Sequence, residues 1–313
     1  MATLSRIDVH HHVTPPSLVE EKMRAGAGGG PTYAWTIDKT LEDMEKGDVR
    51  ASIISLPHPI GVWPDQKDTR GLTREWNDYV ATLVRDHPGK FGQFAMLPIL
   101  DIDGSLREME YALDTLKADG INLMTNIGDK WIGDPYYNPI FEELNRRKVV
   151  VYTHPAAPNC TAGKGGVPGI REAVIEFGTD TTRAIARLLF SGAAAKYPDI
   201  KWIWSHAGGT APFLTERLVR FASHEKGMAE KVPEGVLTYL QRFYYDTAQA
   251  AHPWALASLM RLVAITQVVY GTDFPWRTAV ETTQGLKDYG FSAAELAAID
   301  SGNIERLLPK WKR

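Results

Sequence analysis

The chain has 313 residues, of which 44% are hydrophobic and 23% are charged. This composition is typical of a globular protein with one large core, so we expect a single domain over residues 1–313. With a formal net charge of −3, the chain has no excess of basic residues, which argues against nucleic-acid binding. No apolar run is long enough to span a membrane. The single cysteine, Cys160, excludes an intramolecular disulfide. Together with the lack of a signal-peptide pattern, it favours a cytoplasmic protein.

Short runs of β-branched and aromatic residues recur along the chain and alternate with longer amphipathic stretches. The runs predict strands over 5–9, 49–56, 91–97, 120–125, 149–153, 201–205, 242–246 and 267–271. The amphipathic stretches predict helices over 36–46, 73–86, 105–118, 139–147, 212–224, 253–262, 278–289 and 293–308, and a loop with one or two helices over 169–197. This alternation predicts an α/β fold, a (β/α)₈ TIM barrel with extra helices after strands one, five and eight.

The first predicted strand leads into three consecutive histidines, His10, His11 and His12. Side chains alternate along a strand, so His10 and His12 point the same way and His11 points to the other face. Two imidazoles on one face can close on one cation, because histidine is largely neutral near pH 7 and is the commonest metal ligand. A histidine-rich tract without such a role is the alternative interpretation of this segment alone.

Further polar residues stand where later strands end. His154 follows the fifth strand, His206 the sixth and Asp273 the eighth. The carboxyl ends of all barrel strands meet at one face, so these residues are predicted to share a pocket with His10 and His12. Three histidines and one aspartate suit Zn²⁺ first, with Mn²⁺ or Fe²⁺ as alternatives. His206 is then either a further ligand or an acid/base beside the metal.

These strand-end residues resemble the amidohydrolase superfamily. More narrowly, the segments 8–12, 151–155, 206–213 and 271–275 resemble the branch that contains aminocarboxymuconate-semialdehyde decarboxylase and γ-resorcylate decarboxylase. Residues 120–135 look like the subgroup with the 6-methylsalicylate decarboxylases. The resemblance implies one Zn²⁺ (alternatively Mn²⁺) per subunit, held by His10, His12, His154 and Asp273, with His206 off the metal as a catalytic acid/base. Dinuclear members carry a bridging lysine or carboxylate on strand four, and residues 121–125 offer neither.

Arg217 matches a family arginine that reaches the substrate carboxylate of the neighbouring subunit, which implies a homodimer. A solvated arginine on a helix is the alternative, because Glu216 and Arg220 stand beside it. Family members that act on the muconate dicarboxylate carry a second basic residue before strand two. This chain has residues Leu41 to Glu45, without a basic residue, in that region, which argues against a dicarboxylate substrate.

Other residues are weaker candidates for the pocket. His58, at the end of the second strand, and Trp276 are candidate substrate contacts, with a loop histidine and a core tryptophan as alternatives. Asp246 is expected either to orient His206 or to cap a helix. Candidates for aromatic pocket walls also include Trp63, Trp131 and Phe177.

The resemblance predicts non-oxidative decarboxylation of a small hydroxylated aromatic acid of the salicylate type. The metal would chelate the carboxylate and the adjacent phenolic oxygen, and Asp273 or His206 would protonate the carboxyl-bearing carbon. The alternative is hydrolysis of a lactone, ester or amide by a metal-activated water, with Asp273 as base and His206 facing the oxyanion. A metal-binding barrel without catalysis is a third class, which the presence of both His206 and Asp273 disfavours.

Overall fold

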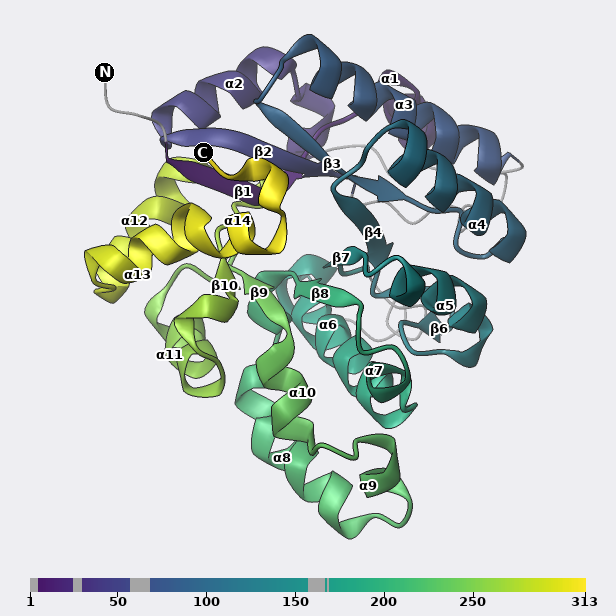
Figure 1. Ribbon diagram of the computed structural model, residues 1–313. Helices are drawn as coiled ribbons and strands as arrows, with labels where there is room; N and C mark the ends of the chain where they lie inside the picture. The colour runs from purple at the N-terminus through teal and green to yellow at the C-terminus, as the bar shows by residue number, and fades with distance from the viewer. Residues whose placement is uncertain (1–4, 25–29, 57–67, 157–166, 168) are drawn as a thin grey trace.

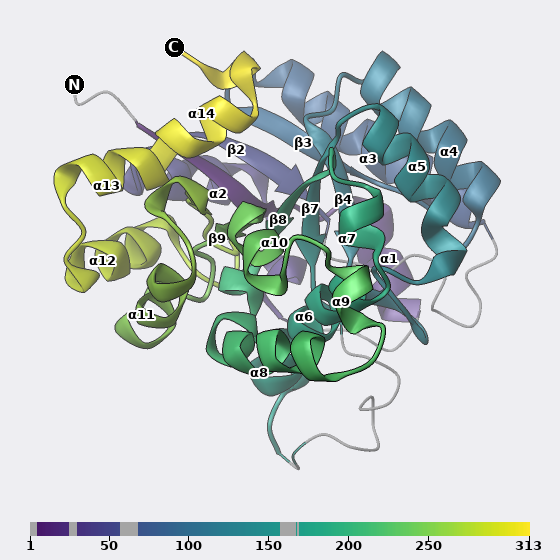
Figure 2. The same cartoon turned by 60° about the horizontal axis from the view of Figure 1, so that its bottom comes forward.

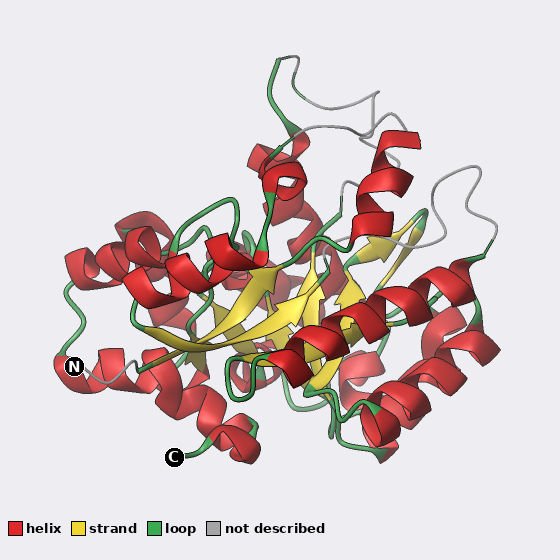
Figure 3. Ribbon diagram, turned by 90° about the horizontal axis from the view of Figure 1, so that it is seen from above, coloured by secondary structure: helices red, strands yellow, loops and turns green. Residues whose placement is uncertain are grey.

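Eight parallel strands form the centre of the molecule, with helices around them (Figures 1 and 3). The computed structural model describes residues 5–24, 30–56, 68–156, 167 and 169–313. The strands pair in the order β1-β2-β3-β4-β7-β8-β9-β10. They are β1 (Arg6–His12), β2 (Val49–Ser55), β3 (Phe91–Met96), β4 (Gly120–Met124), β7 (Val150–His154), β8 (Lys201–Trp204), β9 (Tyr244–Asp246) and β10 (Val268–Val269). Each of the eight predicted strands is present, which confirms the (β/α)₈ architecture.

The sheet closes on itself through the segment that follows β10. The amide of Val9 donates to the carbonyl of Tyr270 at 3.0 Å, and the amide of His12 donates to the carbonyl of Phe274 at 2.9 Å. In the other direction, the Asp273 amide donates to the carbonyl of His10 at 2.8 Å. Closure therefore places Asp273 directly beside the end of β1.

Helices cover the outside of the barrel. They are α1 (Pro16–Arg24), α2 (Ile37–Lys46), α3 (Thr69–Asp86), α4 (Ile102–Glu110), α5 (Asn138–Arg146), α6 (Glu172–Phe190), α7 (Ala193–Lys196), α8 (Ala211–His224), α9 (Met228–Lys231), α10 (Val236–Arg242), α11 (Pro253–Leu262), α12 (Ala279–Tyr289), α13 (Ala293–Ala297) and α14 (Asn303–Leu307). Wide π-helical turns extend α4 over Tyr111–Thr115 and join α13 to α14 over Ala298–Gly302. Within the described residues, no helix is long and apolar enough to cross a membrane.

Some of these elements were not predicted from the sequence. α1 follows strand one, where an extra helix was expected but no bounds were predicted, and α9 and α10 are two helices beyond the one expected after the sixth strand. A two-stranded hairpin of β5 (Asn126–Ile127) and β6 (Lys130–Trp131) follows β4. α9 has four residues and each hairpin strand has two, which is too short for a readable hydrophobic period.

The amino-terminal end of the barrel is filled by the C-terminal segment. Ile304, Leu308 and Trp311 pack against the apolar side chains of the barrel interior, and α14 lies beside β2 in two views (Figures 1 and 2). The Trp311 indole donates to Asp119 at 2.6 Å. With this end plugged, the carboxyl ends of the strands are left for a site, as in other barrels of this kind.

Candidate metal centre

A bulge in β1 turns its histidines toward the barrel interior. Ile7 and Val9 belong to the interior apolar cluster, so strict alternation would point His11 inward as well. The pairing of β1 with β2 shifts register between Asp8 and His11, and His10 and His12 face inward instead. Bulges next to active sites commonly re-aim side chains in this way. His11 lies on the other face, where it contacts Asp8 at 3.1 Å, as the alternation of His10, His11 and His12 predicted.

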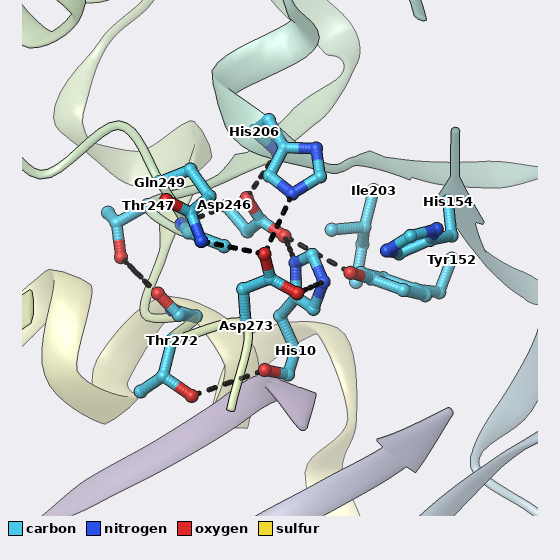
Figure 4. Close-up of polar contacts among 12 residues, drawn as sticks. His10, Tyr152, His154, Ile203, His206, Asp246, Thr247, Gln249, Thr272 and Asp273 are labelled. Atoms are coloured by element: carbon cyan, nitrogen blue, oxygen red, sulfur yellow. Dashed lines mark hydrogen bonds and ion pairs between the residues drawn. The ribbon is translucent and has the colours of Figure 1, made fainter. Parts of the chain in front are cut away.

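Four predicted metal ligands converge in the structure. His10, His12, His154 and Asp273 are all buried, and one donor atom from each lies within 4.8 Å of the others. His10 Nε2 lies 2.9 Å from His12 Nε2, and each of these atoms lies 3.2 Å from Asp273 Oδ1. Figure 4 shows the Asp273 carboxylate between His10 and His206, with His154 nearby. Residues more than 260 positions apart in the sequence therefore share one site, as predicted.

The outer nitrogens of the three histidines fix their tautomers. His12 Nδ1 lies 2.9 Å from the Ser55 carbonyl oxygen, and His154 Nδ1 lies 2.9 Å from the Pro155 carbonyl oxygen. His10 Nδ1 lies 2.7 Å from a carboxylate oxygen of Asp246. A carbonyl or carboxylate only accepts, so each Nδ1 carries the proton and each Nε2 is left as a donor atom for a cation. This donor set of three imidazole nitrogens and one carboxylate fits a divalent transition metal such as Zn²⁺.

The electrostatics of the centre also favour a cation. Burial alone lowers the pKa of His10, but the carboxylates of Asp246 and Asp273 outweigh burial and raise that pKa to about 10. Burial lowers the pKa of His12 and holds that of His154 well below its usual value. Two carboxylates thus hold one positive charge at this point, and the remaining imidazoles stay neutral as metal ligands require.

Asp246 holds His206 through its backbone N–H, in line with one of the two expected roles, and it also contacts a candidate metal ligand. Its Oδ2 accepts from His10, and its Oδ1 accepts the backbone N–H of His206 at 2.7 Å. The Tyr152 hydroxyl also donates to Oδ2, at 3.3 Å. One buried carboxylate therefore links a candidate metal ligand to the loop that carries the candidate acid/base.

His206 stands at the edge of the centre. Its Nε2 lies 3.5 Å from Asp273 Oδ2, and it is outside the four-residue set whose donor atoms converge. Its Nδ1 is buried and has no hydrogen-bond partner among the described residues. His206 and Ala207 both have positive φ angles, 53° and 54°, which non-glycine residues rarely adopt. The loop is therefore held in an uncommon conformation that presents the imidazole to the pocket.

A cavity of about 570 Å³ opens above the centre. His154, His206 and Asp273 lie in its wall together with the aromatic rings of Phe177 and Trp276. The Phe177 ring centroid is 6.1 Å from that of His154, and the Trp276 ring centroid is 5.6 Å from that of His12. The cavity is within the usual size range for a small-molecule site. These two aromatic residues thus line it as expected.

Other predicted pocket residues lie elsewhere. Trp131 is not among the described cavity residues, and its indole donates to Asp180 behind the cavity wall. Arg217 is exposed on α8 and does not line the cavity within this chain. His58 and Trp63 lie outside the described residues.

Two cavity residues with long polar side chains, Gln249 and Arg171, were not singled out from the sequence. Gln249 donates from Nε2 to Asp273 Oδ2 at 2.9 Å and has a positive φ of 53°. Arg171, just before α6, also lines the cavity. Gln249 follows β9 by three residues, and this position after a strand end is the signal that could have identified it.

Comparison with known proteins agrees with this architecture. A family model described as amidohydrolase matches residues 7–310. The chain belongs to this family. A relative named decarboxylase macB, from Penicillium terrestre, is 32% identical over 99% of this chain and 96% of its own length. The 6-methylsalicylic acid decarboxylase of Penicillium expansum is 32% identical over 99% of this chain and 98% of its own length.

The amidohydrolase fold is also found among solved structures. The crystal structure of a protein named amidohydrolase II superimposes with a TM-score of 0.87 at 28% identity, covering 97% of this chain and 100% of the other. The resemblance to the decarboxylase-containing branch is therefore confirmed along the chain, and the solved structure confirms the amidohydrolase fold.

Proposed function

We propose that this amidohydrolase is a metal-dependent, non-oxidative decarboxylase of a hydroxylated aromatic acid such as 6-methylsalicylate. The observation that carries the proposal is the 32% identity to the Penicillium expansum 6-methylsalicylic acid decarboxylase over nearly the full length of both chains. A buried site with three histidines and one aspartate, below a cavity with aromatic walls, supports the same reaction.

The metal ligands in this proposal are His10, His12, His154 and Asp273, and Zn²⁺ is the expected ion, with Mn²⁺ as the alternative. When bound, the ion would supply charge stabilisation and a fixed orientation for the acid. The protein's own part is to turn the Nε2 atom of each of these imidazoles toward the ion, through the acceptors on their Nδ1 atoms, and to bury the rings away from bulk water.

His206 is the proposed proton donor. Asp273 is less suited to this role. Burial raises the pKa of Asp273, but His10 outweighs burial and holds that pKa well below its usual value, so the group stays ionised. His206 faces the cavity and has no partner for Nδ1 within the described chain. It would protonate the ring carbon that bears the carboxylate. The bond to CO₂ then breaks, and its electron pair restores the aromatic ring.

The decisive experiment measures CO₂ release from a panel of hydroxybenzoic acids by purified protein of known metal content. We expect release from 6-methylsalicylate or a close analogue, and a loss of about 10²–10⁴-fold in kcat for His206→Ala with metal still bound. His87→Ala is the matched control, because His87 lies at the far end of α3. The proposal would be overturned if the metal-loaded protein released no CO₂ from any acid and instead hydrolysed lactones or esters.

We also propose that the enzyme is a cytoplasmic homodimer in which Arg217 reaches the partner's site. Arg217 is exposed on α8, and the same helix carries Phe213, which is 81% exposed. Trp254, at the start of the adjacent α11, is 84% exposed. Large exposed aromatic side chains on α8 and on the adjacent α11 are typical of an interface. The single cysteine supports the proposed cytoplasmic location.

Mixed dimers test this part of the proposal. Neither Arg217→Ala nor His206→Ala homodimers should reach the wild-type rate. If Arg217 acts across the interface, a dimer with one subunit of each variant regains one intact site, and activity returns to about half that of wild type. No recovery in isolated mixed dimers would show that Arg217 does not act between subunits.

A further inference from the structure

The wall of the cavity above the metal centre contains one permanently charged basic side chain among its described residues. This residue is Arg171, and the other described residues of the wall include no lysine and no second arginine. A guanidinium stays protonated at any physiological pH and matches carboxylate geometry with paired donors. A cation in this position therefore selects among ligands by charge.

Helix α6 places Arg171 toward the mouth of the cavity. Phe177, on the same helix, contacts the ring of His154 near the metal centre. Arg171 precedes Phe177 by six residues, which corresponds to about 9 Å along a helix axis. Ala173 and Val174, between them in sequence, also line the cavity. The first turns of α6 thus form a wall that runs from Arg171 at the outside to Phe177 beside a metal ligand.

The guanidinium of Arg171 is available for a ligand. Arg171 is exposed, and its side chain makes no ion pair or hydrogen bond with any other part of the chain that the structure describes. Two later arginines of α6 differ in this respect. Arg183 lies 3.9 Å from Glu176, and Arg187 lies 3.3 Å from Asp134.

We infer that Arg171 is a specificity-determining residue that recognises the carboxylate of an incoming aromatic acid. This inference rests on the proposed decarboxylase function. The substrate carries a negative charge at neutral pH, whereas the product phenol is neutral, since phenols titrate near pH 10. A cation at the cavity mouth therefore favours the substrate over the product. It acts within the same subunit, unlike Arg217, and its effect falls on binding rather than on the chemical step.

Steady-state kinetics give the first test. Arg171→Met keeps a long apolar side chain and removes the charge. It should lower kcat/KM for the aromatic acid about tenfold and leave kcat unchanged, because the contact forms before the chemical step. Arg171→Lys should recover part of the loss. Arg187→Met is the matched control, because it removes the same charge from α6 outside the cavity, and it should leave both constants unchanged.

Equilibrium binding to the metal-loaded protein tests the inference without turnover. Benzoate and phenol are the probes, because they differ in charge and share the ring. Arg171→Met should weaken benzoate binding about tenfold and leave phenol binding unchanged, and added salt should reduce the benzoate difference. Equal losses of affinity for both probes would make Arg171 a structural residue. The inference would also be overturned if Arg171→Met bound benzoate as tightly as wild type, or if wild type did not bind benzoate.

The two tests separate this inference from the proposed function. A protein that releases no CO₂ but loses benzoate affinity on Arg171→Met supports the anion site and contradicts the decarboxylase. A protein that releases CO₂ with the same kcat/KM in wild type and Arg171→Met supports the decarboxylase and contradicts the anion site.

Discussion

Asp246 Oδ2 accepts a hydrogen bond from His10 Nδ1 at 2.7 Å, and neither side chain is accessible to solvent. The second oxygen of the same carboxylate accepts the backbone N–H of His206 at 2.7 Å. The orientation of a candidate metal ligand and the position of the candidate acid/base loop thus depend on one side chain (Figure 4). Carboxylate–histidine pairs of this kind fix the ring and increase its strength as a ligand.

Asp246→Asn is predicted to weaken metal binding about 10–100-fold. The asparagine oxygen can still accept from His206, but its amide then faces His10 Nδ1 as a donor. His10 would have to move its proton to Nε2, the atom that faces the metal site. Metal affinity measured by competition with a chelator checks this.

Asp180→Asn is the control for Asp246→Asn, since Asp180 is also a fully buried, hydrogen-bonded carboxylate. It lies outside the convergent donor set and should leave metal affinity within about threefold of wild type. Equal metal affinity in wild type and Asp246→Asn would show that Asp246 does not tune the site.

Gly209→Ala is predicted to disrupt the loop that carries His206. A Cβ at Gly209 would lie 2.1 Å from the carbonyl oxygen of Gly178 on α6, and φ is +64° there. Backbone must shift on one side of the contact, so we expect a destabilisation of about 2 kcal/mol or more and a fall in kcat. Urea unfolding and the turnover rate are the measurements.

Gly227→Ala separates the steric clash from the cost of a positive φ. Gly227 also has a positive φ, +79°, but a Cβ there meets no atom within 4 Å. Gly227→Ala should reduce the free energy of unfolding by about 1 kcal/mol and leave kcat unchanged. If the two variants are equally destabilised and equally active, close packing of the His206 loop against α6 is not required.

Asp43→Asn is predicted to stabilise the protein at neutral pH. Burial raises the pKa of Asp43 to about 6, whereas an unfolded aspartate titrates near 3.9. Between these values the folded state binds more protons than the unfolded state, so the free energy of unfolding falls as pH rises from about 4 to 6. Asparagine avoids this loss and can still accept the N–H of Ala279, which lies 3.1–3.2 Å from the two carboxylate oxygens.

The expected gain for Asp43→Asn is at most about 3 kcal/mol at about pH 7.5, shrinking toward zero near pH 4. Denaturant unfolding across this range measures it. Glu45→Gln, an exposed carboxyl group on the same helix, should show no comparable gain. A loss of stability for Asp43→Asn at neutral pH would mean that the ionised carboxylate is the better acceptor for Ala279.

The sequence was sufficient for the strands and for the convergence of the candidate metal ligands, because both follow from local rules. Strand-end positions of His154, His206 and Asp273 converge in any closed parallel barrel. The contact of Asp246 with His10 and the position of Arg171 in the cavity wall could not be predicted in this way. The carboxylate of Asp246 reaches His10 across the barrel, a contact between residues 236 positions apart. The position of Arg171 depends on the direction in which α6 leaves its loop, which no local pattern encodes.

The β1 bulge illustrates the same limit. Alternation correctly placed His10 and His12 on one face of β1 and His11 on the other. It could not say which of these two faces meets the barrel interior. A register shift between Asp8 and His11 decides this, and register depends on the partner strand. Period and composition therefore predict which side chains share a face, whereas pairing decides where that face points.

Asp180 is predicted to hold the β5–β6 hairpin against the cavity wall. On α6, its carboxylate accepts from the Thr125 hydroxyl, from Asn126 Nδ2 at 2.7 Å and from Trp131 Nε1 at 2.6 Å. Thr125 in turn donates its amide to the His154 carbonyl at 2.8 Å. Asp180→Ala leaves three donors without their acceptor and opens a small void. It should reduce the free energy of unfolding by about 3 kcal/mol.

Because α6 also carries Phe177 and begins directly after Arg171, the loosened wall should raise KM for the aromatic acid more than it lowers kcat. Thermal unfolding and steady-state kinetics measure the two effects. Asp129→Ala removes an exposed carboxylate from the turn of the same hairpin, 86% accessible and paired only with Lys130 among the described residues. It should change stability by less than about 0.5 kcal/mol. If Asp180→Ala is no less stable than Asp129→Ala, then the hairpin is held by its apolar contacts, and the buried carboxylate contributes nothing net to the wall.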